Sequence, residues 1–175
     1  LFDTLARVKQ LYDHEPGRGE ATLDALIAYL RTAMPQMRQP GSTLARECEL
    51  ARTYVEIIAA RGDARLRVAI DDGADSASVP FPAMLLLPLV EHAVVVSRVT
   101  PLDDNAIGIR ADASGGRLSV TVSHSGDAFA RDDAPALSRV RSQLHALFAK
   151  EARVEVRVTE GRGSAVNLEV PHADR

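Results

Sequence analysis

Cysteine, net charge and long apolar runs are three things that this sequence has little of. Its 175 residues include one cysteine, Cys48, so an internal disulfide is impossible and a reducing compartment suits the chain. The formal net charge of −3 gives no electrostatic reason to expect a nucleic-acid partner. The most apolar stretch, Met84 to Val96, is interrupted by one proline and two polar residues and is shorter than the roughly 20 residues of a membrane-spanning helix.

A secretion signal is missing from the start of the chain as well. The amphipathic pattern is already in phase at Leu1, which favours a fragment whose upstream part is missing. We therefore expect a cytoplasmic domain that reaches a membrane only through that upstream segment. With 46% hydrophobic and 26% charged residues the composition is that of a globular protein and argues against disorder.

Three amphipathic helices are predicted in the first third of the chain. Apolar residues recur at helical spacing in the stretches 1–12, 23–34 and 44–58. Pro16-Gly17 ends the first run and Pro35 closes the second. Ser42 or Thr43 is the candidate N-cap of the third helix. The apolar stripes need a partner surface, which is provided by one another, by the following domain or by a second copy of the chain.

After Gly62 the pattern changes from helical to alternating, which is typical of half-buried strands. Strands are predicted at 66–70, 107–109, 118–122, 154–158 and 166–170, and helices at 84–96 and 137–148. Gly115-Gly116 is expected to form a hairpin turn. This order of elements predicts an α+β fold in which helices cover one face of a mixed sheet.

Four blocks of sequence carry a family resemblance, and they occur in the order that the family has. Leu1 to Leu5 looks like the end of a His-Phe-Leu-Phe-Asn-Thr-Leu block whose phosphoacceptor His would lie two residues before Leu1. The stretch 43–66 is similar to the helix and first strand that follow in the family. Pro82 to Ala93 resembles the N-box P-x-x-L-L-Q-P-L-V-E-N-A, and Ala136 to Leu144 resembles a GLxNxxxRL segment. Together they resemble the LytS-like sensor histidine kinases of the GHKL ATPase superfamily.

The resemblance implies two regions. Residues 1–61 would be dimerisation-type helices of the phosphoacceptor region, and residues 62–175 a GHKL or Bergerat-like two-layer α/β sandwich. It also implies a homodimer, with a response regulator or a partner kinase as the further partner. The spacing of Phe2, Leu5, Val8 and Leu30 suits contact between two protomers, and the alternative is that these helices only cover the chain's own domain.

The resemblance further implies a site for ATP and Mg²⁺, from which this sequence departs at nearly every position. Glu91 stands at the position of the Glu that polarises the attacking group, and it is retained. His92 replaces the Asn that ligates Mg²⁺, and imidazole is a poor ligand for this hard cation. Ser123 stands at the aligned position of the adenine-binding Asp. Gly126 is a retained motif glycine, whereas Ala136 replaces a glycine at the start of the next helix.

Other substitutions fall in the same predicted pocket. The lid, 128–135, has no glycine and carries Asp132-Asp133, which would repel a triphosphate. Arg139 replaces an Asn, and an apolar run replaces the phosphate contacts after the N-box. Val94 to Val96 within this run are expected to fill the core.

These departures predict a degenerate, pseudokinase-like module of a two-component sensor histidine kinase that acts through dimerisation or partner binding. No cofactor is then expected, and ATP with Mg²⁺ would bind only if the site is still functional. One alternative is an active but divergent kinase that autophosphorylates an upstream His. Another is a sensor that reuses the pocket for a ligand, or for a metal held by His92 and His124 beside Glu91.

Overall fold

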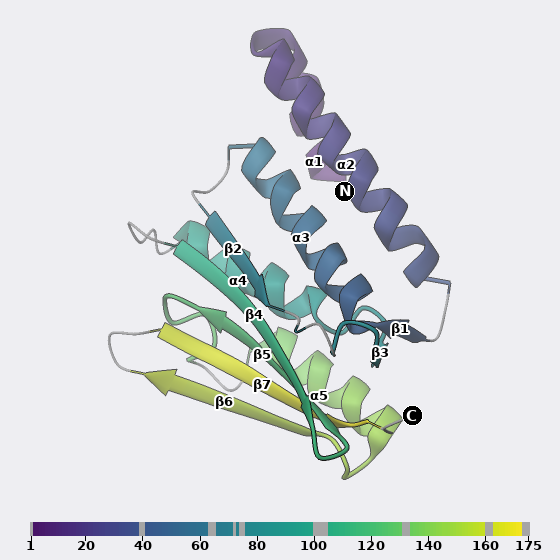
Figure 1. Cartoon of the computed structure of the whole chain (residues 1–175). Helices are drawn as coiled ribbons and strands as arrows, with labels where there is room; N and C mark the ends of the chain where they lie inside the picture. The colour runs from purple at the N-terminus through teal and green to yellow at the C-terminus, as the bar shows by residue number, and fades with distance from the viewer. Residues whose placement is uncertain are drawn as a thin grey trace.

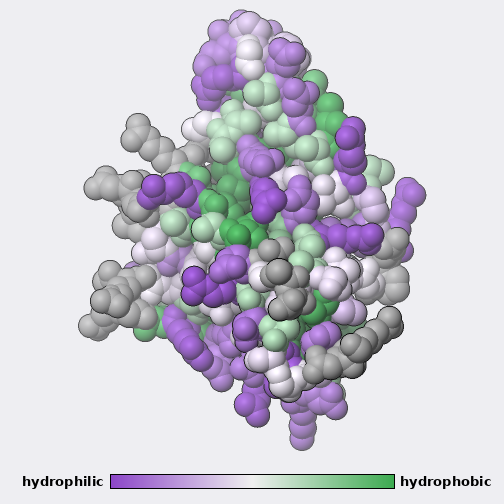
Figure 2. Space-filling model, viewed as in Figure 1, coloured by the Kyte–Doolittle hydropathy of each residue, from purple (hydrophilic) through white to green (hydrophobic). Residues whose placement is uncertain are grey.

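The computed structural model consists of a projecting pair of helices and a sandwich of helices packed on a sheet (Figure 1). It describes residues 2–38, 41–62, 66–71, 73, 76–99, 105–130, 134–159 and 163–172. Helices α1 (Phe2–His14) and α2 (Pro16–Gln36) form the pair, and α2 also packs along α3 (Leu44–Ala60). Hydrophilic side chains gather at the projecting end of the pair (Figure 2).

The break between α1 and α2 occurs at the predicted place, but the second helix begins earlier than its apolar stripe. Pro16 starts α2, since proline has the backbone φ of a first helical turn and lacks an N–H that would be unpaired there. Gly17 and Gly19 are therefore part of the helix. A Cβ at Gly19 would lie 3.0 Å from the backbone nitrogen of Tyr12, so the close approach of the two helices needs a residue without a side chain.

Helix α3 has the capping residue that the sequence indicates. The hydroxyl of Thr43 accepts the backbone N–H of Arg46 at 3.4 Å, which confirms Thr43 as the N-cap. Residues just before the helix form β1 (Gly41–Thr43), which pairs with β3 (Pro80–Pro82) in a short antiparallel ribbon that the sequence did not predict.

A five-stranded mixed sheet forms the centre of the sandwich. Its strands, in spatial order, are β2 (Leu66–Asp71), β4 (Asn105–Ser114), β5 (Arg117–His124), β7 (Gly163–Pro171) and β6 (Arg153–Thr159). The pair β2 and β4 is parallel, and the other neighbours are antiparallel. Helices α4 (Leu87–Val99) and α5 (Pro135–Phe148) lie together on one face (Figure 1). The predicted α+β fold with a mixed sheet is confirmed.

Burial alternates along the strands as a one-sided sheet requires. In β5, Leu118, Val120 and Val122 are fully buried, and they join side chains of α3, α4 and α5 in the main core. The intervening residues of β5 are only half-buried. On that helix-free face, the hydroxyls of Ser119 and Thr121 donate to the side-chain oxygen of Asn167 in β7.

Candidate functional site

Glu91 and His92 lie side by side on α4, at the edge of the core. Their neighbours Val90 and Ala93 are completely buried, whereas Glu91 and His92 themselves are half-buried. Helical periodicity therefore places the two polar side chains on the margin of the apolar face.

The start of α4 is held by a carboxylate from another helix. Glu47 of α3 is almost completely buried, and its oxygens accept the backbone N–H groups of Met84, Leu85 and Leu86 at 2.8, 2.9 and 3.2 Å. These residues form the turn immediately before Leu87, the first residue of α4, and a buried N–H in such a turn needs an acceptor from elsewhere in the chain. Burial raises the pKa of the Glu47 carboxyl group, and the three N–H donors oppose that effect. Glu47 thus fixes where the helix that carries Glu91 begins.

The segment after β5 closes against α4. We call residues Gly126 to Ala130 the cap segment. Nε2 of His92 lies 2.7 Å from the carbonyl oxygen of Ala128, a distance at which the imidazole N–H donates to it. The ring of Phe129 is completely buried, and its centroid is 6.1 Å from that of His92. His92 therefore fastens the middle of the cap segment to α4.

His124, the last residue of β5, joins the cap segment to α4 at a second point. Its Nδ1 accepts the backbone N–H of Gly126 at 2.9 Å. Its Nε2 is 2.8 Å from the hydroxyl oxygen of Ser97, and that hydroxyl donates to the carbonyl oxygen of Ala93 at 2.9 Å. The side chain is 3% exposed, and burial lowers the pKa of the imidazole. The ring is a neutral connector between β5, α4 and the cap segment.

A third attachment comes from β7. The hydroxyl of Ser164 donates to the carbonyl oxygen of Gly126 at 2.7 Å and accepts the backbone N–H of Phe129 at 2.9 Å. Ser164 is 4% exposed, so both bonds lie in the interior. The cap segment is held by side chains from three elements: α4, β7 and β5, the strand that directly precedes it.

The structure does not bring Ser123 together with the other predicted site residues. It lies on the half-buried, helix-free face of β5, opposite Gly108 in β4, and its hydroxyl donates to the carbonyl oxygen of Gly108 at 3.4 Å. His124 lies on the helix-covered face and stands two residues before Gly126. That spacing is the one between the Asp and the first Gly of the D-x-G motif in the family that the sequence resembles.

Three of the remaining predicted residues, Glu91, His92 and Ala136, line a small cavity beside α4, whereas Gly126 does not. Its volume is about 240 Å³. It is lined by Pro88, Glu91, His92, Val95, Pro135, Ala136 and Arg139. Pockets that hold a drug-sized ligand have volumes of roughly 300–1,000 Å³, so this cavity lies below that range. Glu91, His92 and Ala136 thus line one space, which is smaller than a typical ligand site.

The three valines at 94–96 differ in solvent exposure. Val94 is 1% exposed and belongs to the core, and Val96 packs partly against it. Val95 is 54% exposed, which corrects the expectation that all three fill the core. Successive residues of a helix point in directions about 100° apart, so a run of three cannot share one buried face.

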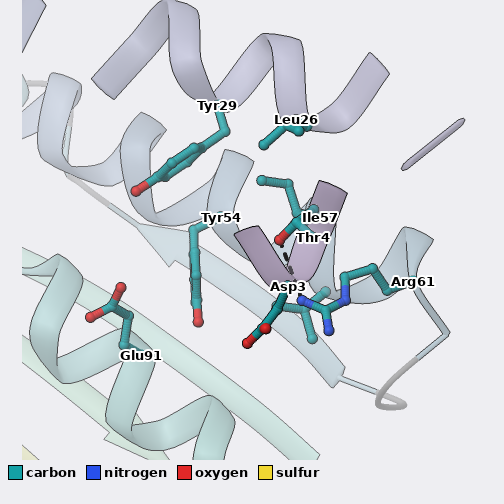
Figure 3. A pocket seen from close by; sticks show the side chains of 9 residues that line it. Asp3, Thr4, Leu26, Tyr29, Tyr54, Ile57, Arg61 and Glu91 are labelled. Carbon is teal, nitrogen blue, oxygen red and sulfur yellow. Dashed lines mark hydrogen bonds between the residues drawn. The ribbon is translucent and has the colours of Figure 1, made fainter. Parts of the chain in front are cut away.

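On its other side Glu91 faces a second cavity, of about 310 Å³, between α4 and the three preceding helices (Figure 3). Tyr54 stands between Glu91 and the far end of this pocket, where a guanidinium nitrogen of Arg61 donates to the hydroxyl of Thr4 at 3.4 Å. Burial raises the pKa of Glu91, and the Arg139 guanidinium opposes it. Burial, with the Glu91 charge added, also raises the pKa of Tyr29 in the wall of the pocket.

The described residues contain neither a cluster of metal ligands nor a helix that could span a membrane. Among the residues that the structure describes, no group of three or more His, Cys, Asp or Glu side chains is arranged to hold a metal ion. Within the same residues, no helix combines the length and apolar character that crossing a bilayer requires. Asp132 and Asp133 of the predicted lid lie outside the described residues.

Four contributors to the site were missed by sequence reasoning, namely Glu47, Ser97, Phe129 and Ser164. Each is buried, and their roles depend on contacts between residues 27 to 39 positions apart. The only sequence signal was the two-residue spacing of His124 and Gly126. An alignment that starts the D-x-G motif at His124 instead of Ser123 would have drawn attention to His124.

Known histidine kinases are similar to this chain in sequence. A family model described as histidine kinase matches residues 1–66. The sensor histidine kinase BtsS of Escherichia coli strain K12 is 27% identical to this chain over 124 residues, which are 70% of this chain and 22% of that protein. The chain therefore spans about a fifth of the length of the curated relative that it matches.

Solved structures match the fold. Histidine kinase ThkA, in complex with response regulator protein TrrA, has a TM-score of 0.56 and 14% identity, covering 86% of this chain and 48% of that one. Full-length ShkA in complex with AMPPNP has a TM-score of 0.51 and 17% identity, covering 92% of this chain and 37% of that one. At these identities the likeness shows the fold alone, an α+β fold that resembles those of histidine kinases.

Proposed function

We propose that this chain is the cytoplasmic module of a two-component sensor histidine kinase, with its nucleotide site closed by the cap segment. Residues 1–61 would serve as the dimerisation and phosphoacceptor-type region, and residues 62–175 as the ATPase-like domain. The module would act in signal transduction through dimerisation or partner binding rather than by cycling ATP. The histidine kinase family match and the resemblance to BtsS support the class of protein.

The chemistry of the site residues does not fit a magnesium-bound triphosphate. Mg²⁺ is bound through oxygen ligands, but His92 offers a nitrogen that is already engaged by the Ala128 carbonyl group. At the position of the adenine-binding carboxylate stands His124, whose two nitrogens are engaged by Gly126 and Ser97. A neutral imidazole in that arrangement has no acceptor left for an adenine amino group.

The closed cap segment is the observation that carries this proposal. Phosphate groups are usually gripped by backbone N–H groups that glycines leave accessible. Here the N–H groups of Gly126 and Phe129 are used within the protein, and the Phe129 ring fills interior space beside His92. Opening the segment would break bonds to α4, β5 and β7 before a nucleotide could enter.

Titration with a fluorescent ATP analogue and Mg²⁺ tests the proposal. We expect no saturable binding up to millimolar nucleotide, with ShkA, which was crystallised with AMPPNP, as the positive control. A second titration uses the double variant His92→Asn/His124→Asp, which restores both family residues and removes two attachments of the cap. Saturable micromolar binding by the unaltered chain would refute the proposal, whatever the variant does.

An active but divergent kinase is the second candidate, and one observation favours it. Glu91 lines the same cavity as Asp3 and Thr4 in the first turn of α1, which is the helix that the phosphoacceptor His would precede (Figure 3). A carboxylate next to that helix is placed to accept a proton from an attacking group. The candidate predicts incorporation of phosphate from ATP into a longer chain that includes the upstream His, and loss of that incorporation in Glu91→Gln.

A ligand or metal sensor is the third candidate and has less support. For a metal, His92, His124 and Glu91 would have to converge, whereas both imidazoles have protein partners and no three such side chains among the described residues are arranged to hold a metal ion. Elemental analysis of protein purified without a histidine tag tests this candidate. A stoichiometric transition metal would support it, and a metal content near zero would exclude the metal form.

The proposed partners are a second copy of the chain and a response regulator. Four large apolar side chains on the helical pair are exposed by 45–50%, and they lie in two pairs seven residues apart: Leu5 and Tyr12 on α1, Ile27 and Met34 on α2. A seven-residue spacing keeps apolar side chains on one helix face, which suits packing against another pair of helices. That ThkA was solved with the response regulator TrrA supports the second partner.

A further inference from the structure

The hydrogen bonds around His124 determine which ring nitrogen carries the proton. Nδ1 receives the N–H of Gly126, so Nδ1 has no proton of its own. The hydroxyl proton of Ser97 goes to the Ala93 carbonyl group, so the Ser97 oxygen is available as an acceptor for Nε2–H. The ring is therefore the neutral Nε2–H tautomer, and each of its nitrogens makes a bond that depends on this state.

A proton added at Nδ1 would abolish one of these bonds. Nδ1–H and the N–H of Gly126 would then point at each other at a separation of 2.9 Å, with no acceptor between them. Gly126 is the first residue of the cap segment, so its displacement also pulls its carbonyl oxygen away from the Ser164 hydroxyl. Because Ser164 also holds the N–H of Phe129, the disturbance passes to the buried end of the segment.

We propose that His124 is a proton-controlled latch, in which protonation at Nδ1 releases the cap segment from β5 and β7 and opens the space beside α4. This inference deepens the proposed function and rests on it for the meaning of that space. It gives the closed site a form of regulation: acidification opens the segment, and neutral pH closes it.

Two titratable groups face His124 and act on its pKa in opposite directions. His92, across from it on α4, disfavours a second positive charge in the same place, whereas Asp127 in the cap segment favours it. Among the described residues, Ser97 on α4 contacts the ring, and Ile107 of β4 and Ser164 of β7 are the cross-strand partners of His124; none of these three side chains is charged. Burial is the largest influence and keeps the pKa below the ordinary value of 6.5, so the latch is closed at neutral pH.

Amide hydrogen exchange measured by NMR on the whole chain, without nucleotide, tests the latch. Between about pH 7.5 and pH 5, after correction for intrinsic exchange, protection of the Gly126 and Phe129 amides should fall. Linkage sets the limit at about tenfold for each pH unit below the ordinary His pKa of 6.5. In His124→Asn, whose side-chain oxygen replaces Nδ1 as an acceptor and does not titrate, protection should stay constant. His145→Gln, at an exposed histidine of α5, should behave as the unaltered chain.

Several results would overturn the latch. One is constant protection in the unaltered chain, and another is the same decline in His124→Asn. A third is an equal decline at the amides of Val120 and Val122 in β5, because then the whole domain opens. If His124→Asn does not fold, the ring ¹⁵N shifts of the unaltered chain decide, and a neutral Nδ1–H tautomer would refute the inference. Since no nucleotide is used, these results are independent of whether ATP binds.

Discussion

Replacing Glu47 by alanine should destabilise the protein far more than replacing its surface neighbour on the same helix. The carboxylate of Glu47 is 1% exposed and accepts three backbone N–H groups at the start of α4. Two of those groups belong to Leu85 and Leu86, whose residues are completely buried. Alanine removes all three acceptors and leaves a space where the carboxylate was.

The magnitude follows from the unpaired donors. A buried N–H without a partner costs about 1–3 kcal/mol. Three such groups, partly compensated by water entering the vacated space and by the loss of a buried charge, correspond to about 3–5 kcal/mol. A domain of this size loses about 2–4 °C in Tm for each kcal/mol, so the expected decrease is roughly 10 °C. Glu47→Gln keeps one oxygen acceptor and should lose about half as much.

Urea denaturation followed by circular dichroism measures this difference. The matched control is Glu49→Gln, because Glu49 lies on α3 with its side chain half exposed and pairs with Arg52 at 2.9 Å. Exposed pairs of this kind contribute below about 1 kcal/mol. If Glu47→Ala lost no more stability than Glu49→Gln, the view that Glu47 anchors α4 would be refuted.

Three further predictions test other parts of the structure. Gly163→Ala should cost about 2 kcal/mol or more by thermal denaturation, since φ is +95° and a Cβ would collide with the backbone at the end of β5. Gly17→Ala, by contrast, meets open space and should stabilise α2 by up to about 1 kcal/mol. Equal effects of the two substitutions would contradict this reasoning. Glu91→Gln should raise the free energy of unfolding at neutral pH. Because burial raises the folded pKa of Glu91, the contribution of this carboxyl group to stability is favourable below its ordinary pKa of 4.5 and is lost as pH rises. An unchanged stability–pH curve in the variant would contradict this argument. Ile27→Glu/Met34→Glu should weaken self-association at least tenfold by light scattering, and unchanged association would remove these residues from the interface.

Local patterns were enough to predict most of the elements. The alternation of Leu118, Val120 and Val122 predicted both β5 and its buried face. The hydroxyl residue before Leu44 predicted the start of α3. These predictions succeed because the period of a strand, the period of a helix and the geometry of an N-cap all depend on residues within a few positions of one another.

The candidate site was predicted only in part, and His124 shows why. Ser123 and His124 are adjacent, but neighbouring residues of a strand point to opposite faces, so a shift of one position exchanges the site residue for one on the helix-free face. The register of β5 between β4 and β7 pairs His124 with Ile107 and Ser164, and burial places His124 on the helix-covered face. A comparison of motifs cannot give that register, because it depends on pairing with strands elsewhere in the sequence.

The helices and strands of the sandwich and their apolar faces are determined by the sequence itself, since each depends on the residue types present and their spacing. The closing of the cap segment was decided by tertiary structure alone. Its bonds join Ala128 to His92 and Phe129 to Ser164, pairs that are about 35 residues apart in the chain. Such contacts exist only after the strands and α4 have packed, because each side chain is aimed by a different element.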